Sequence, residues 1–543
     1  MFLTRLVDFE LLAVEGDTSK LIGEFATLMA GISLAITVPL IVINGLPQEL
    51  LWGMEHFLIA LTMALAGLFA IMSWESIFPE RKDIVIMGPL PVRQSTLFLA
   101  KLSALSTALG LAILSLNCFT GLGWALQFEP AHGGILGLIR SIAAYWATVS
   151  LAGAFVFFCI LTVQGLTSLL LPRQVFLRLS GALQMAGFIV VLGDFILEPS
   201  LESISALTVA RNQHLLHCLP SYWFFGLFQQ LNGSTGGAAH PVFVSLSQRA
   251  WAGLALAAAG ALISVLAAYF HTMPRIVEDP EIQPVMRSWA CKLPDMGNPV
   301  QRAVLAFSWR TLMRSRQHRL MLGFFLGVGL TVMLLYLNTP VAHQETADRV
   351  GDLDVATLVV MSLAVLGARM VVAIPVMLKA NWIFQVTQLH PPNMYLMAGR
   401  RALFTIGVLP MWIAIAGLTL WMRGGWLVAT HLVALGLLGT VLSDISLFTL
   451  RKLPFACSWM PGRANLVAIF FGGVIVGLPL AMSAGKYEIE LLRMPWGWAW
   501  LLAGSCVVTS LSRWRLAMAG RMRETLVFEE EDAPVLVSLG LGR

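Results

Sequence analysis

Long apolar runs separated by short polar stretches recur along almost the whole chain. A membrane-spanning helix needs roughly 20 mostly apolar residues, and twelve stretches approach that length. In the first part of the chain they are Leu21–Ile43, Phe57–Ser73, Leu97–Phe119, Ser141–Leu161, Leu179–Leu197 and Ala250–Phe270. In the second part they are Leu320–Leu337, Val355–Val376, Leu403–Trp421, Trp426–Leu447, Leu466–Met482 and Trp496–Leu511. The pattern predicts an all-α integral membrane protein with about 12 transmembrane helices, because these runs are continuously apolar instead of alternating as in transmembrane strands.

Composition and charge add an orientation to this picture. The mean hydropathy is +0.79, and 57% of the residues are hydrophobic against 12% charged, which is too apolar for a soluble domain. Short cytoplasmic loops collect Lys and Arg, and most of the 35 basic residues fall inside if the N-terminus is inside. Both termini are therefore predicted to be cytoplasmic. The positive balance is explained by topology and implies no nucleic-acid partner.

The spacing of the spans predicts two parallel six-helix halves. Residues 1–275 and 301–543 form the halves, and residues 276–300 form a cytoplasmic linker rich in proline and charge. Because each half has an even number of spans, the halves share one orientation and are related by a pseudo-twofold axis along the membrane normal. The second half opens with a basic amphipathic lead-in, Phe307–Phe325, which matches the surface helix predicted at the N-terminus.

The loop between the second and third spans is similar in the two halves. The first loop begins with "WESIF" and the second with "NWIF". Pro91 precedes Lys101 by ten residues, as Pro391 precedes Arg401. Each loop thus offers an aromatic exit from the membrane, a turn marked by proline and a basic start to the next helix.

Five stretches together resemble a bacterial ABC exporter permease of the ABC-2 type, with two fused six-helix halves. They are "GPLPVRQSTLFLAK", "LPSYWFFGLFQQLNG", "LMRSRQHR", "IPVMLKANWIF" and "LPFACSWMPG". The resemblance implies that Trp74–Arg93 and Lys379–Arg401 are coupling segments that dock on an ATPase. The coupling residues implied are Trp74, Glu75, Phe78, Arg81, Lys82, Pro91, Arg93, Lys101, Asn381, Trp382, Phe384, Pro391, Arg400 and Arg401.

ATP hydrolysis, if it drives this protein, belongs to another chain. No G-x-x-x-x-G-K-[ST] phosphate-binding loop occurs, and no segment between the spans is as long as an ordinary domain. We therefore expect a non-enzymatic permease subunit without a cofactor of its own. Two cytoplasmic ABC ATPase subunits would bind ATP and Mg²⁺, and the complex would export a substrate across the bacterial cytoplasmic (inner) membrane.

Charged residues inside the spans are few. A Lys, Arg or Asp near the bilayer centre costs roughly 2.5–3.5 kcal/mol on insertion scales, and Arg369 and Asp444 are the best candidates. They are predicted either to pair across adjacent helices or to line the translocation path. The shortage of buried charge favours a hydrophobic or amphipathic substrate.

The outer segment after the fifth span holds two further patterns. In "HLLHC", His214, His217 and Cys218 have spacing suitable for zinc, but a fourth ligand is not visible, so no metal site is predicted. The following aromatic block, Leu219–Phe228, predicts an interfacial or re-entrant helix, which would act either as an outer gate or as an aromatic belt.

Two other functions are compatible with the pattern. Twelve spans in two parallel halves also describe a secondary transporter of major-facilitator-like architecture. The loop after the second span lacks the glycine and Asp/Arg pattern of that family, and no set of carboxylates for proton coupling is evident. A membrane scaffold subunit without transport activity is the third hypothesis.

Overall fold

All regular elements in the described part of the chain are helices. The computed structural model describes residues 18–38, 47–74, 93–128, 134–199, 201, 203–233, 240–278, 299–338, 346–372, 393–423, 425–447, 455, 480, 483–488, 490–492 and 494–521. The chain divides into two compact units, Met1–Pro284 and Val285–Arg543. Their boundary falls within the linker predicted from the sequence.

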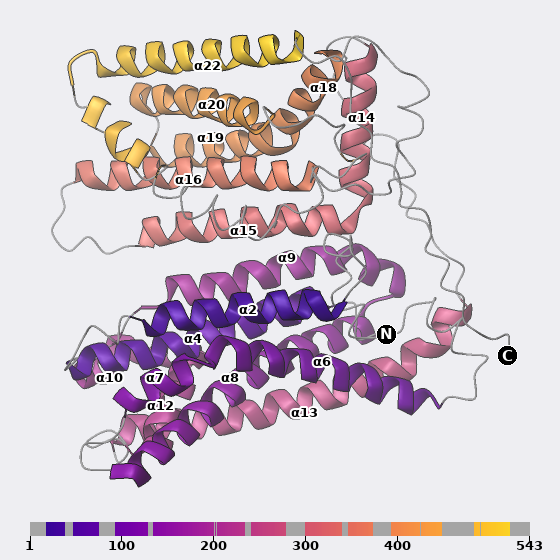
Figure 1. Cartoon of the computed structure of the whole chain (residues 1–543), viewed down its shortest axis with the longest axis vertical. Coiled ribbons are helices and arrows are strands. Elements are labelled where there is room, and N and C mark those ends of the chain that lie inside the picture. The colour runs from indigo at the N-terminus through magenta and orange to yellow at the C-terminus, as the bar shows by residue number, and fades with distance from the viewer. Residues whose placement is uncertain are drawn as a thin grey trace. The chain divides into compact units, whose positions relative to one another are not determined.

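Unit 1 is built on six long helices that run alongside one another (Figure 1). They are α2 (Thr18–Thr37), α4 (Gln48–Met72), α6 (Gln94–Asn117), α8 (Gly134–Leu170), α9 (Arg173–Leu197) and α13 (Pro241–Glu278). Helix α8 is central and packs against α4 and α13. The last contact is very close, because a Cβ atom at Gly165 would lie 2.7 Å from the backbone carbon of Ser264.

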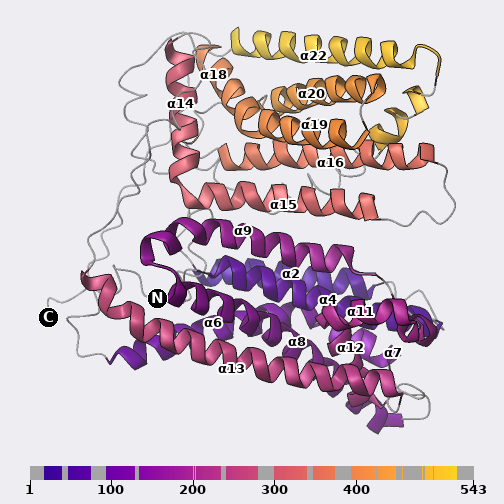
Figure 2. The same cartoon turned by 180° about the vertical axis from the view of Figure 1, so that it is seen from behind.

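Short helices lie at one end of unit 1 (Figure 2). They are α7 (Thr120–Gln127), α10 (Ile204–Thr208), α11 (Ala210–Cys218) and α12 (Pro220–Asn232). Helix α12 begins with proline and ends at Gly233, whose φ of 72° permits the left-handed turn that terminates it. Its rings at Tyr222, Phe224, Phe225 and Phe228 are at most 1% exposed and belong to the core of the unit. The aromatic-belt interpretation is therefore wrong for these four residues.

Unit 2 is organised around a buried central helix, α16 (Thr346–Val372), in which Ala356, Val359, Met361 and Ala364 are fully buried. The elements that complete it are α14 (Pro299–Arg314), α15 (Arg316–Asn338), α18 (Asn393–Leu403), η4 (Phe404–Val408), α19 (Leu409–Arg423), α20 (Trp426–Leu447) and α22 (Gly497–Arg521). Helices α15, α16, α19, α20 and α22 lie side by side, and α14 crosses one end of them (Figures 1 and 2).

The basic lead-in of unit 2 is a bent pair of helices. Helices α14 and α15 meet at Ser315 at an angle of 83°. The Ser315 hydroxyl lies 2.5 Å from Nδ1 of His318 in the first turn of α15, and the Arg319 Nη1 donates to the Met313 carbonyl at 2.7 Å. These hydrogen bonds provide partners for polar groups where α14 ends and α15 begins.

The continuous helical stretch formed by α18, η4 and α19 contains a π-helical turn at Phe404–Val408. The Leu409 N–H donates to the Phe404 carbonyl, five residues back. Pro410 follows and has no N–H to donate, and a wide turn accommodates its ring. Gly407 lets this turn approach α16, because a Cβ atom there would lie 2.7 Å from the Cβ of Ala368.

The described helices are typical of a multi-pass membrane protein. Eight of them are long and apolar enough to cross a membrane, or nine if α14 and α15 together form one bent span. Eight coincide with predicted spans, and the predicted span Leu320–Leu337 falls in α15.

Helix α2 is apolar only over Phe25–Thr37, and α22 lies outside the eight because hydroxyl groups and arginines lower its hydropathy. The span predicted at Leu466–Met482 falls outside the described residues except Leu480, and the predicted surface helix lies in the undescribed residues 1–17.

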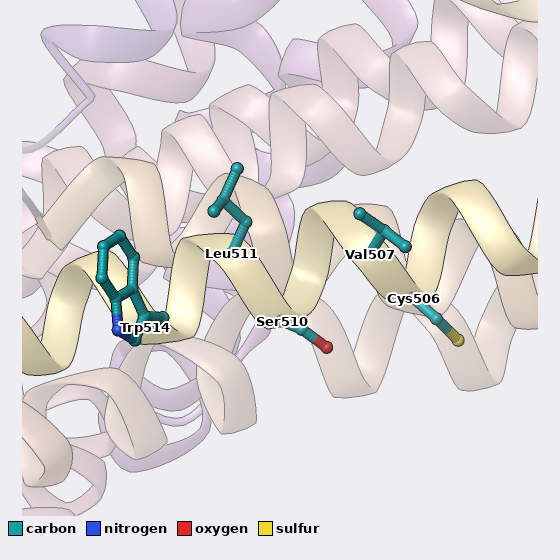
Figure 3. A pocket seen from close by; sticks show the side chains of 5 residues that line it. All are labelled: Cys506, Val507, Ser510, Leu511 and Trp514. Carbon is teal, nitrogen blue, oxygen red and sulfur yellow. The ribbon is translucent and has the colours of Figure 1, made fainter.

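Cysteine labelling tests on which side of the membrane Cys218 lies and whether α22 crosses the bilayer. Cys218 in α11 and Cys506 in α22 are both exposed on the protein surface (Figure 3 shows Cys506). In variants that retain one cysteine each, we expect a membrane-impermeant maleimide added to intact cells to label Cys218. Cys506 should react only after the protein is denatured, because the apolar surroundings of a lipid-facing thiol exclude the polar reagent. Labelling of Cys506 in intact cells would show that α22 does not cross the bilayer.

Candidate functional site

The candidate site in unit 1 is the point where α4 leads into the first predicted coupling segment. Trp74 is 3% exposed, and its carbonyl accepts a hydrogen bond from the Gln164 side chain of α8. One turn earlier, the Ile71 carbonyl accepts from Gln184 Nε2 of α9 at 3.3 Å. Two buried glutamines thus bind carbonyls in the last turn of α4 and just beyond it. Trp74 is thereby linked to α8, and the preceding turn to α9.

The far end of this segment enters α6. Arg93 directly precedes the helix, and Lys101 lies two turns inside it. Lys101 is only 5% exposed and has an interaction partner. Its assignment as a coupling residue stays a prediction.

The candidate site in unit 2 is a buried ion pair at the end of the second predicted coupling segment. The Arg400 Nε of α18 lies 2.5 Å from the Asp444 Oδ1 of α20, and the Ser512 hydroxyl of α22 donates to the other Asp444 oxygen at 3.0 Å. Asp444 is fully buried, and the Arg400 side chain is 25% exposed. The start of the third span is thereby tied to two other helices.

The predicted pairing of Arg369 with Asp444 has a different geometry. The Arg369 Nε of α16 donates to the Ser446 carbonyl of α20 at 2.9 Å, two residues beyond Asp444. The two residues therefore occupy the same end of unit 2, but the ion-pair partner that the structure gives Asp444 is Arg400. A direct contact between Arg369 and Asp444 stays a prediction.

The remaining predicted coupling residues lie outside the described residues, except Arg401, which is exposed at the end of α18. The residues outside are Glu75, Phe78, Arg81, Lys82, Pro91, Asn381, Trp382, Phe384 and Pro391. Their assignment as coupling residues stays a prediction.

A buried histidine cluster in unit 1 was not predicted from the sequence. The His56 Nε2 of α4 lies 3.1 Å from Glu198 Oε1 and 3.2 Å from the Ser221 hydroxyl, and Ser221 itself donates to Glu198. A cavity of about 40 Å³ beside them is also lined by Asp194. Because the serine and the carboxylate face the same imidazole nitrogen, this group does not have the relay geometry of a nucleophilic triad.

A second histidine cluster occurs in unit 2. The two ring nitrogens of His431 in α20 face Glu488 and Thr357, and Asp354 lies near one of them. In both units the carboxylate that contacts the histidine, Glu198 or Glu488, follows the predicted fifth span. This shared position is a signal that the sequence contained, but only the structure shows which histidine each carboxylate meets.

The zinc-like spacing in α11 gains no further ligands among the residues that the structure describes. The His217 ring lies against the Arg249 guanidinium, with Nε2 and Nη2 3.2 Å apart. A neighbouring cation disfavours metal binding, and no group of His, Cys, Asp and Glu in the described residues is arranged to hold a metal ion.

The depression on α22 is lined by one helix alone (Figure 3). It is formed by Cys506, Val507, Ser510, Leu511 and Trp514. Among the described residues, no polar group from another element lines it, and the exposed apolar side chains are typical of a lipid-facing surface.

Comparisons with protein-family models, with curated proteins and with solved structures found no match to this chain. The likeness to ABC exporter permeases rests on the motifs in its sequence.

Proposed function

We propose that the chain is the transmembrane permease subunit of an ATP-driven exporter, with two cytoplasmic ABC ATPase subunits as partners. The observation that carries the proposal is the anchoring of both predicted coupling segments. One segment leaves the bundle at Trp74, whose carbonyl is held by Gln164, and the other ends at Arg400, which is held by Asp444.

This anchoring matters because a segment that transmits force must be attached firmly where it enters the bundle. Side chains from α8, α9, α20 and α22 fix the two ends. A pull on either segment would reach several spans at once, and packed helices transmit such strain with little loss. On this proposal ATP and Mg²⁺ bind to the partner, and the substrate is hydrophobic or amphipathic.

The setting that goes with this function is the bacterial cytoplasmic membrane with both termini in the cytoplasm. The excess of basic residues in the inner segments supports it. The parallel arrangement of two six-helix halves belongs to the same proposal.

A second candidate, a secondary transporter, is favoured by one observation. Ionisable groups buried in membrane helices commonly serve as proton relays, and unit 1 has His56 with Glu198 while unit 2 has His431 with Glu488. No such set is evident in the sequence, and these two clusters favour this alternative.

Co-purification separates the two functions. The tagged chain extracted in mild detergent should retain a soluble ATPase with a P-loop, identified by mass spectrometry, together with ATPase activity. Replacing Arg81, Lys82, Trp382 and Phe384 by Ala should abolish that association if these residues contact the ATPase.

A matched control variant replaces an arginine and a tryptophan that lie outside the coupling segments. Arg211 in α11 and Trp251 in α13 are both exposed, and their replacement by Ala should leave the complex intact. If the chain instead purifies alone and moves solutes in vesicles only under a proton or sodium gradient, the exporter proposal fails and the secondary transporter replaces it.

A further inference from the structure

His431 lies where three elements of unit 2 meet. Its Nδ1 is 2.8 Å from Glu488 Oε1 in the short helical segment 483–488. Its Nε2 is 2.8 Å from the Thr357 hydroxyl and 3.9 Å from Asp354 Oδ1, both in α16. The side chains of His431 and Glu488 are 3% and 6% exposed, and that of Asp354 is 14% exposed. The imidazole is thus enclosed by two carboxylates and a hydroxyl.

The hydrogen-bonding groups around the ring fit a proton on each nitrogen. An ionised Glu488 only accepts, so Nδ1 donates to it. The Thr357 hydroxyl is placed to donate its one hydrogen to the backbone carbonyl of Asp354 at 2.8 Å. In that orientation its oxygen accepts from Nε2. This arrangement suits an imidazolium.

The charges lead to the same conclusion. Two carboxylates lie beside one imidazole, and a nearby negative charge favours the protonated, charged form of the ring. The imidazolium balances Glu488 directly and faces Asp354, which retains some contact with the surface.

Among the described residues, the contacts of α18, α19 and α22 with α20 place no charged side chain beside His431. Helix α19 contributes Trp412, whose Nε1 donates to the Leu432 carbonyl at 2.7 Å. Helices α18 and α22 contribute Arg400 and Ser512 at Asp444, which lies about 20 Å from His431 along α20. Within the part of the chain that the structure describes, Glu488 and Asp354 are the charged groups that contact the ring.

We propose that His431, Glu488, Asp354 and Thr357 form a proton-binding site, and that the bound proton holds segment 483–488 against α16 and α20. Loss of the proton turns the Thr357 hydroxyl toward Nε2 and removes the positive charge that attracts Glu488 to His431. In the predicted topology this end of unit 2 faces the outside, so the proton comes from the external medium. The proposed proton-binding site does not depend on which of the two candidate functions is correct, because it is built from contacts within unit 2.

Nitrogen-15 spectra of histidine-labelled full-length protein in lipid vesicles test the protonation. The resonances of His431 are assigned by difference against His431→Gln, with His214→Gln as the exposed control. At about pH 7.5, roughly one unit above the ordinary histidine value, both ring nitrogens of His431 should be protonated. An unprotonated nitrogen from His431 at this pH would overturn the proposal.

The carboxylate variants test whether Glu488 and Asp354 stabilise the protonated ring. They also identify the His431 resonances if His431→Gln does not fold. At the same pH, Glu488→Gln and Asp354→Asn should each convert part of the His431 population to the neutral ring. An unchanged imidazolium in both variants contradicts the proposed site.

Amide hydrogen exchange measures the attachment of the outer segment. Segment 483–488 should exchange several-fold faster in His431→Gln than in the wild type, whereas His214→Gln should match the wild type. Equal exchange in all three proteins would mean that the proton does not hold the segment.

Discussion

Replacing Arg400 with methionine should lower the free energy of unfolding by about 3–5 kcal/mol, because it leaves the Asp444 carboxylate buried without its cation. Methionine keeps much of the length of the side chain, so the loss reports charge and not volume. Thermal and denaturant unfolding of the full chain in detergent would measure it. We also expect ATPase coupling to fail in this variant at temperatures where the fold persists.

A double variant separates the ion pair from simple damage. Arg400→Met combined with Asp444→Leu removes both charges and should recover most of the lost stability, because an apolar pair often replaces a buried ion pair without cost. Arg513→Met is the matched control, since Arg513 follows Ser512 on α22 and is exposed. If Arg400→Met is as stable as Arg513→Met, Asp444 does not depend on Arg400.

Replacing Gly165 with alanine should destabilise unit 1 by about 1–3 kcal/mol, the usual cost of overpacking. The new Cβ would lie 2.7 Å from the backbone carbon of Ser264, so α8 and α13 would have to move apart. Unfolding of the full chain in detergent gives the change in stability.

The control for this prediction is Gly181 in α9. No heavy atom lies within 4 Å of a Cβ built there, so Gly181→Ala should be neutral or stabilise the helix by roughly 0.5–1 kcal/mol. Similar effects of the two substitutions would mean that the close approach of α8 and α13 is not required.

Hydropathy located the eight described helices that are long and apolar enough to cross a membrane, but not their ends. The apolar run at Ser141–Leu161 is the middle of a helix that spans Gly134–Leu170. Its last turns contain Thr167 and Ser168, whose hydroxyls bond back to carbonyls of the same helix. A hydropathy pattern registers such residues as polar and therefore stops early.

The partners of the buried charges were less predictable than the helices. Arg369 and Asp444 were recognised because both interrupt apolar runs, whereas Arg400 was interpreted only as part of a coupling segment. Which side chains meet depends on the rotation of each helix about its axis, and the linear sequence does not determine that rotation between helices. The same reason explains why His56 and His431 were missed.

The π-helical turn at Phe404–Val408 gives the third span of unit 2 a mechanical property that a straight helix lacks. The turn stores one surplus residue, and each residue corresponds to about 100° of rotation in an α-helix. If the surplus moved along the span by one turn, the residues it crossed would swivel about the helix axis while both ends kept their positions. A displacement of Arg400 along the helix axis would then be converted into a rotation of α19 about that axis.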